Sequence, residues 1–156
     1  MECRERMEQY LRENGVPFEV MTHSRAYTMP EVAAALHVPG KQVAKVVMVE
    51  ADGKMLMLVI PSPYRLDFAQ VRAALGTEKV SLAKEQEFAS LFPDCAPGAM
   101  PPFGNLYDVP VYVDQALAEK EDIVFRVGTH RHTAKVAYAD FARLVQPAVG
   151  EFAYLS

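Results

Sequence analysis

Lys45, an ionisable residue inside an apolar run, is the first feature of the sequence that could do chemistry. It lies in VAKVVMV, residues 43–49, and in a strand it would share a face with Val43, Val47 and Val49. Desolvating an ammonium group without a partner is costly, so this side chain must either reach water at an edge or meet an anion. Two interpretations stay open: an edge lysine whose stem covers apolar surface, or a cation beside a pocket that binds a phosphate or an anionic transition state.

A basic segment in the last third of the chain is the second such feature. The stretch RVGTHRHTAK, residues 126–135, carries Arg126, Arg131 and Lys135, and residues 123–139 contain no acidic side chain. The whole chain has a formal net charge of −4, so this segment departs from the overall composition. It is typical either of a surface that receives a polyanion or of a solvated turn with ordinary charges.

His130 and His132 lie two residues apart and would face the same way in a strand, where they could bind a metal ion. Metal-binding strands with such a pair usually add a glutamate a few residues later, and residues 133–136 contain none. We therefore expect no metal site. An exposed position and a pocket wall are the uses that remain for these two histidines.

The segment GAMPPFG, residues 98–104, fits neither a helix interior nor a central strand, because Pro101 and Pro102 stand between two glycines. Proline fixes the backbone angle φ and glycine frees it, so the chain follows one defined path here and other groups can approach its backbone closely. The segment is either a rigid connector to VPVYVD, residues 109–114, or a loop that presents N–H groups to a ligand.

Cys3 and Cys95 are the two cysteines, and they lie far apart in the sequence without a CxxC or Cys/His spacing. This pattern predicts two free thiols. A catalytic role for Cys95 as a nucleophile is the alternative, but the sequence places no obvious activating base near it.

The remaining sequence predicts the helices and strands that must position these residues. Two apolar runs flank Asp52-Gly53, the pair that a type I′ turn requires, and predict a β-hairpin over residues 42–62. Thr28 with Glu31 predicts a helix start, and Gly76 a helix end. Helices are predicted at residues 4–14, 29–36, 66–75, 84–92 and 138–145, and further strands at residues 17–23, 79–82, 109–114, 122–128 and 132–138.

This order of elements and the composition limit the class of protein. Helices interleave with strands and hairpins, which predicts a mixed sheet of the α/β or α+β class in a single domain over residues 1–156. The longest apolar run, Met55 to Ile60, is far shorter than the roughly 18 residues of a membrane helix, and the charged N-terminal segment lacks the apolar stretch of a secretory signal. We expect a cytoplasmic protein with no membrane partner and no DNA partner.

The features above follow one another in an order that resembles a known family. The chain reads KVVMV, then a DG hairpin, then GAMPPFG before VPVYVD, then VGTH ahead of a final YADFARLV helix. This order, which covers nearly the whole chain, resembles the YbaK and prolyl-tRNA synthetase editing-domain family of aminoacyl-tRNA deacylases. The resemblance implies a curved mixed sheet flanked by helices. It also implies hydrolysis of a small amino acid, alanine or cysteine, wrongly esterified to a tRNA, typically the tRNA for proline.

The resemblance also implies roles for individual residues. Lys45 matches the family's essential strand lysine, which engages the 3′-terminal adenosine of the substrate. Residues 98–104 match a glycine/proline loop whose backbone faces the aminoacyl carbonyl, and Gly128-Thr129 matches a turn, followed here by His130. Hydrolysis of an activated ester requires a place for the oxyanion and an attacking water rather than a protein nucleophile, so the absence of a catalytic triad from the sequence is expected.

These matches give the expected site, which we take to need no cofactor and no metal. The residues expected in catalysis are Lys45, Gly98, Ala99, Gly128 and Thr129. The residues expected to bind the substrate are Tyr27, Met29, Met100, Pro101, Phe103, Gly104 and His130; among them Tyr27, Met29, Met100 and Phe103 would wall a pocket that excludes the larger, correct amino acid. The residues expected to bind tRNA are Arg126, Arg131 and Lys135.

The expected partners are a mischarged tRNA and an aminoacyl-tRNA synthetase. A non-catalytic module that binds the tRNA acceptor end or a synthetase is the alternative function, and it predicts salt-sensitive tRNA binding without ester cleavage. A small metalloprotein that uses His130 and His132 is a third hypothesis.

Overall fold

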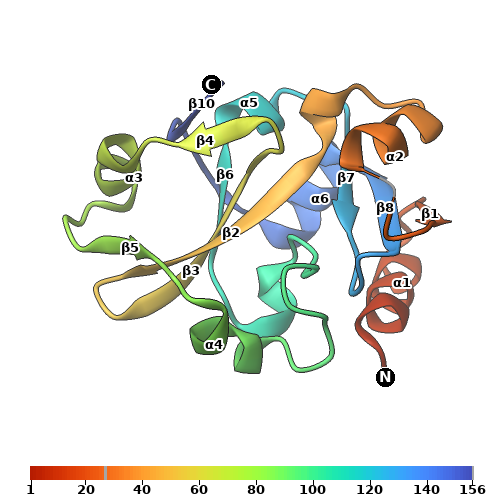
Figure 1. Ribbon diagram of the computed structural model, residues 1–156, viewed down its shortest axis with the longest axis horizontal. Coiled ribbons are helices and arrows are strands. Elements are labelled where there is room, and N and C mark those ends of the chain that lie inside the picture. Colours follow the sequence, from red (N-terminus) through yellow and green to blue (C-terminus); the bar gives the residue numbers. More distant parts are fainter. Residues whose placement is uncertain (27, 156) are drawn as a thin grey trace.

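The structure is a computed structural model that describes residues 1–26 and 28–155 (Figure 1). Tyr27, which the sequence assigns to the amino-acid pocket, lies outside the described residues. The largest sheet has the strand order β5-β2-β3-β6-β9. Its strands are β2 (Ala44–Ala51), β3 (Lys54–Pro61), β5 (Val80–Leu82), β6 (Val111–Asp114) and β9 (Ala148–Gly150). Because β6 runs parallel to both β3 and β9 while β2 is antiparallel to β3 and β5, the predicted mixed sheet is confirmed.

Two smaller sheets complete the β structure. One is antiparallel with the order β1-β8-β7, and the other pairs β10 with β4. Their strands are β1 (Glu19–Thr22), β4 (Tyr64–Leu66), β7 (Asp122–Arg126), β8 (His132–Ala137) and β10 (Ala153–Leu155). The C-terminal strands β9 and β10, and the short strand β4, were not predicted from the sequence.

Helices surround the sheets, as Figure 1 shows, and confirm the predicted arrangement of a mixed sheet flanked by helices. They are α1 (Cys3–Glu13), α2 (Met29–Ala35), α3 (Phe68–Leu75), α4 (Glu85–Phe88), α5 (Gln115–Ala118) and α6 (Tyr138–Val145), with single 3-10 turns at Gly40–Gln42, Ala89–Leu91 and Gly104–Tyr107. The helix predicted over residues 84–92 is thus α4 followed by a 3-10 turn. Within the described part of the chain, every helix is too short or too polar to span a bilayer.

Local sequence signals explain where several elements begin and end. Thr28 and Glu31 form the predicted capping box at the start of α2. The Asp67 carboxylate accepts hydrogen bonds from backbone N–H groups in the first turn of α3, and Gly76 ends that helix in the left-handed conformation. Both residues of the β2–β3 turn, Asp52 and Gly53, have positive φ angles of 51° and 78°, as a type I′ turn requires.

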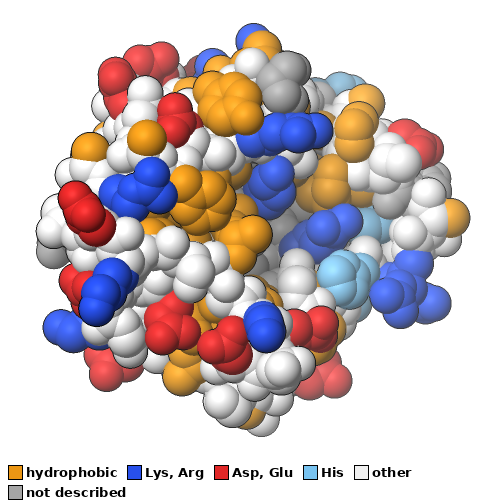
Figure 2. All heavy atoms as spheres, turned by 60° about the vertical axis from the view of Figure 1, so that its left-hand side comes forward, with side chains coloured by type: hydrophobic (Ala, Val, Ile, Leu, Met, Phe, Trp, Pro, Cys, Tyr) orange, Lys and Arg blue, Asp and Glu red, His pale blue; other side chains and the backbone are white. Residues whose placement is uncertain are grey.

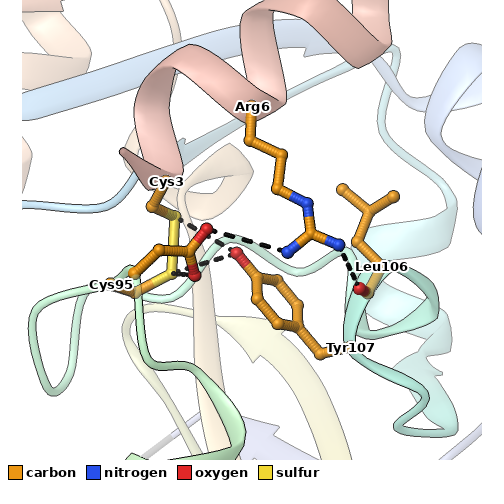
Figure 3. The surroundings of a disulfide bond; sticks show 6 residues. Cys3, Arg6, Cys95, Leu106 and Tyr107 are labelled. Atoms are coloured by element: carbon orange, nitrogen blue, oxygen red, sulfur yellow. Dashed lines mark hydrogen bonds and ion pairs between the residues drawn. A yellow bond between two sulfur atoms is a disulfide. The ribbon is translucent and has the colours of Figure 1, made fainter. Parts of the chain in front are cut away.

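The two cysteines form a disulfide bond, so the prediction of two free thiols was wrong. Cys3 begins α1 and Cys95 lies in the segment before Gly98, and their separation of 92 residues left no pattern for the sequence to reveal. Figure 3 shows Arg6 and Tyr107 beside this bond. The Tyr107 hydroxyl lies 3.2 Å from Cys95 Sγ, and the Arg6 guanidinium lies 4.7 Å from the centre of the Tyr107 ring. The bond therefore fastens the start of α1 to the segment that leads into the glycine/proline loop.

Helix α1 also packs directly against the turn after β7. Gly128 has a φ angle of 89°, and a Cβ atom on it would lie 2.8 Å from Cys3 Cβ and 3.1 Å from the backbone nitrogen of Arg4. The first of these distances is shorter than real Cβ contacts, so glycine is the residue that allows α1 to approach this closely. The start of α1 thus contacts both the segment before Gly98 and the turn at Gly128.

Removal of the disulfide should destabilise the protein. Cross-linking residues 92 positions apart restricts the unfolded chain, and loss of such a bond typically lowers the free energy of unfolding by about 2–5 kcal/mol. We expect Cys95→Ser to lose this amount in urea unfolding without reductant. Dithiothreitol should lower the free energy of unfolding of the wild type to that of the variant and leave the value of the variant unchanged. If the wild-type value does not change with reductant, the bond does not contribute to stability.

Gly128→Ala should destabilise the protein more than Gly53→Ala. Both positions have positive φ, which costs an alanine about 1 kcal/mol, but the space around Gly53 is open whereas Gly128 faces Cys3. We expect Gly53→Ala to lose about 1 kcal/mol and Gly128→Ala about 2–4 kcal/mol in the same unfolding assay. Equal losses would show that the contact with α1 does not constrain position 128.

Candidate functional site

A cavity of about 80 Å³ lies where strands β2 and β7 separate. An isolated parallel bridge between Val43 and Val124 joins the two chain segments, after which β2 and β7 belong to different sheets. Residues 43–46 form one wall of the cavity and Phe125 and Arg126 form another. The other lining residues come from distant parts of the chain: Met29, Ser62, Gly98 and Met100.

Several residues expected at the site from the sequence meet at this cavity. Lys45, Gly98 and Arg126, together with Met29 and Met100, all line it. These residues belong to β2, to the glycine/proline loop, to β7 and to the start of α2, so the fold alone brings them together. Lys45 and Gly98, which the sequence-based hypothesis places at one site, thus line the same hollow.

Lys45 lies at the mouth of the cavity. Its ammonium nitrogen donates a hydrogen bond to the backbone oxygen of Tyr64 at 3.0 Å, and the residue as a whole is exposed. Partial burial, and after it the positive charge of Arg65, lowers the pKa of Lys45. An ammonium group has several N–H donors, so the bond to Tyr64 fixes its direction and leaves donors for a ligand.

Arg126 is the second cation of the cavity. Counted from the bridge between Val43 and Val124, Lys45 and Arg126 occupy matching positions, each two residues further along its strand. Side chains two residues apart in a strand point to the same face, so both cations lie on the face of the bridged valines. Burial lowers the pKa of Arg126, and its Nε atom is buried without a hydrogen-bond partner.

The cavity carries positive charge without a protein counter-charge. None of the described residues that line it is acidic. Figure 2 shows a hollowed face on which Lys, Arg and His side chains gather, while the acidic side chains in that view lie mostly away from the hollow. An anionic group is therefore the ligand that this cavity favours.

Backbone hydrogen bonds hold the loop and the turn together beside the cavity. The Gly128 N–H donates to the Ala99 oxygen at 2.8 Å, and the Ala96 N–H donates to the Gly128 oxygen at 2.8 Å. The Ala99 N–H in turn donates to the Ala96 oxygen at 3.0 Å. Because their backbone groups are engaged with one another, Ala99 and Gly128 fix the position of Gly98, whose φ of 81° needs a glycine.

Thr129 and His132 form a short hydrogen bond within the turn. Thr129 Oγ1 lies 2.6 Å from His132 Nδ1 and accepts a bond from the Arg131 N–H at 3.1 Å. Burial, and after it the charge of Arg4, lowers the pKa of His132 and favours its neutral form. The bond joins Thr129 Oγ1 to His132 Nδ1 whichever atom carries the proton, so the hydroxyl is committed to shaping the turn.

His130 contacts the loop rather than a partner histidine. Its Nε2 donates to the Pro97 oxygen at 3.0 Å, and its ring lies against Gly98. His130 and His132 therefore bind different groups, and they do not converge on a common point. The histidine ring instead links the turn at Gly128 to the segment that ends at Gly98.

The second half of the glycine/proline loop belongs to the core. Pro101, Phe103 and Gly104 are buried and do not line the cavity, and the Phe103 ring packs against Phe125 and Phe141 with centroids 5.5 and 5.3 Å apart. A Cβ atom at Gly104 would lie 2.5 Å from the Val109 oxygen. The structure thus places the expected pocket wall Phe103 in the interior, because its ring fills the space beneath the sheet.

Arg131 and Lys135, which the sequence groups with Arg126, do not line the cavity either. Arg131 is exposed at the tip of the β7–β8 turn. Lys135 lies in β8, opposite Glu19 of β1 and Val124 of β7. The basic segment therefore separates into one cation in the cavity and others outside it.

Sequence reasoning missed the residues that follow β3. The Ser62 N–H donates to the Val43 oxygen at 2.7 Å, Tyr64 holds Lys45, and Arg65 lowers the pKa of Lys45. The hairpin could have indicated these residues. It pairs Lys45 with Ile60, so the polar residues that follow β3 must lie near Lys45.

Comparisons with known proteins identify the family of this chain. The family model of the aminoacyl-tRNA editing domain matches residues 23–144. The proline–tRNA ligase of Staphylococcus saprophyticus is 25% identical over 130 residues, which is 83% of this chain and 22% of that protein. The proline–tRNA ligase of Bacillus velezensis is 26% identical over 129 residues, 76% of this chain and 22% of that protein. The chain thus spans about a fifth of the length of these relatives.

Solved structures share the fold. A crystal structure described as a candidate trans-editing enzyme for prolyl tRNA synthetase superposes with a TM-score of 0.84 at 20% identity, over 99% of this chain and 98% of that chain. The crystal structure of the hypothetical protein APE2540 superposes with a TM-score of 0.81 at 20% identity, over 95% of this chain and 99% of that chain. With the family match over most of its length, the chain belongs to the aminoacyl-tRNA editing domain family.

Proposed function

We propose that the protein hydrolyses the ester bond of a mischarged aminoacyl-tRNA and acts in trans, apart from the synthetase that made the error. The observation that carries this proposal is the meeting of Lys45 and Gly98 at one small cavity without acidic residues. In an editing domain, such a cavity suits the 3′ end of tRNA, which is anionic and carries the ester.

The available groups fit a reaction in which water attacks the ester carbonyl carbon. A new C–O bond forms to water, the bond to the ribose oxygen breaks, and a proton passes to that oxygen. Lys45 supplies positive charge where negative charge develops, and the open backbone at Gly98 lets the carbonyl approach closely. The vicinal ribose hydroxyl of the substrate orients or activates the water.

The proposed reaction uses water and no protein nucleophile. Cys95 is bonded to Cys3, and the Thr129 hydroxyl is committed to His132. Catalysis then depends on positioning and on electrostatic stabilisation, both of which a rigid loop and a fixed cation provide.

The size of the cavity favours a small amino acid. Its volume of about 80 Å³ is small, and its apolar walls suit a methyl or thiol side chain. Met29 and Met100 lie on its wall. We infer that alanine or cysteine is removed from the tRNA for proline, with discrimination by exclusion of the larger residue.

The proposed partners follow from the same chemistry. A mischarged tRNA is the substrate, and a prolyl-tRNA synthetase is the source of the error, since the relatives are proline–tRNA ligases. Such a reaction takes place in the cytoplasm. A module that only binds the acceptor end would use the same positive cavity, and it is distinguished by the absence of ester cleavage.

Lys45→Ala should abolish deacylation without unfolding the protein. Loss of one group that stabilises the developing charge typically lowers kcat by about 10²–10³-fold. We would incubate the wild type and the variant with a panel of mischarged tRNAs, including Ala and Cys on the tRNA for proline, and measure release of the amino acid above the spontaneous rate.

Lys54→Ala, at the other end of the same hairpin and outside the cavity, is the matched control and should retain full activity. Far-UV circular dichroism and the melting temperature should be the same for both variants. An unfolded Lys45→Ala would assign Lys45 a structural role, and a wild type inactive on the whole panel but able to bind tRNA would favour the binding module.

A further inference from the structure

Arg126 has a buried nitrogen that the protein itself does not satisfy. It is the last residue of β7, it lines the cavity, and its Nε atom has no hydrogen-bond partner. Buried polar groups in folded proteins are nearly always paired, and the exceptions call for a specific explanation such as an absent ligand. Because a guanidinium group only donates hydrogen bonds, the missing partner must be an acceptor.

The surroundings of Arg126 point to an anion as that acceptor. Lys45 holds the matching position on β2, and no described residue in the cavity lining is acidic. Burial lowers the pKa of both cations, so the fold places two charges where each is partly desolvated and neither is neutralised. A negatively charged group in the cavity would supply the acceptor that Arg126 Nε lacks.

We propose that Arg126 binds one phosphate group, the phosphodiester that precedes the 3′-terminal nucleoside of the tRNA, while Lys45 remains for the ester. This inference rests on the proposed function. The phosphates are the permanent anions of an aminoacyl-tRNA, whereas its α-amino group is a cation that Arg126 repels. A planar guanidinium group binds two phosphate oxygens at once, which fixes the direction of the ligand as well as holding it.

The two halves of the site then serve different parts of the substrate. The phosphate lies on the β7 side of the cavity, at Arg126, and Lys45 with the apolar walls at Met29 and Met100 remains for the ester and the amino-acid side chain. Gly98 faces the ester from the loop side. In this arrangement Arg126 is a positioning residue: it holds the terminal nucleotide so that the carbonyl meets the loop.

This role separates Arg126 from the exposed cations of the β7–β8 turn. Arg131 is exposed at the tip of the turn, where salt screens its attraction for a polyanion. Arg126 is partly buried and pairs with one defined group, so its contribution depends on a single phosphate rather than on the length of the nucleic acid.

Binding of small ligands tests the subsite without any need for activity. We would titrate the wild type with adenosine, adenosine 5′-monophosphate and inorganic phosphate by calorimetry. The nucleotide should bind at least about ten-fold more tightly than adenosine, as expected for charge-assisted hydrogen bonds, and more tightly than inorganic phosphate. If adenosine and adenosine 5′-monophosphate bind with equal affinity, there is no phosphate subsite. If inorganic phosphate binds as tightly as the monophosphate, the subsite does not belong to the terminal nucleotide.

Variants at position 126 locate the effect. Arg126→Gln should bind the nucleotide no more tightly than adenosine, and Arg126→Lys should recover part of the difference. Arg143→Gln, on α6 and outside the cavity, is the matched control and should behave as the wild type. If Arg126→Gln keeps the full preference for the nucleotide, Arg126 does not bind the phosphate. If that variant fails to fold, the Arg126→Lys and wild-type titrations decide the matter.

Kinetics on minimal substrates tests the positioning role. We would compare 3′-alanyl-adenosine with and without a 5′-phosphate. In the wild type the phosphate should raise kcat/KM about 10–100-fold, and in Arg126→Gln the ratio of kcat/KM for the phosphorylated ester to that for the unphosphorylated ester should fall to about one. Equal kcat/KM values for the two esters in the wild type would overturn this inference but not the proposed deacylase activity. Phosphate-dependent binding without any hydrolysis would instead defeat the deacylase and retain the subsite.

Discussion

The site depends on the way strands β2 and β7 meet and then separate. The bridge between Val43 and Val124, and a 2.7 Å hydrogen bond from the Gln42 side chain to the Asp122 oxygen, join the two segments at one end. Beyond that point β2 pairs with β3 and β7 pairs with β8, so the space between β2 and β7 is left to side chains. Pleating then turns the residues two positions past the bridge toward the same face. The separation of the two strands therefore places two cations, Lys45 and Arg126, beside one cavity.

Those cations oppose the folding of the protein as much as they serve its function. Lys45 and Arg126 are partly desolvated, and the cavity lining offers no described carboxylate to either of them. A chain selected for stability alone would fill this split with apolar residues. The interior beneath it does so: Phe103, Phe125 and Phe141 pack there without polar groups. Local violations of good packing rules are expected at functional sites, and this one includes Lys45, the strand lysine that the family resemblance selects.

The sequence predicts those parts of the structure that depend on local chemistry. The type I′ turn at Asp52-Gly53 and the capping box at Thr28 follow from the conformations that a few neighbouring residues prefer, and both are present. The disulfide could not be predicted in this way, because the proximity of Cys3 to Cys95 is produced by the whole intervening fold. The same holds for Phe103: the loop was identified by its glycines and prolines, but whether a given side chain faces the ligand or the core is decided by packing across the sheet.

Helix α1 supports the site from behind, although the family model matches only residues 23–144. Its first residue is bonded to Cys95 and lies against the backbone of Gly128, while the Cys3 N–H donates to the Asp94 oxygen at 3.2 Å. Gly128 in turn exchanges backbone hydrogen bonds with Ala96 and Ala99 on either side of Gly98. The glycine that faces the cavity is thus held by a chain of contacts that begins at α1. In the proposed deacylation, which depends on positioning, small displacements lower the rate, so we expect this support outside the shared domain to matter even though no residue of α1 lines the cavity.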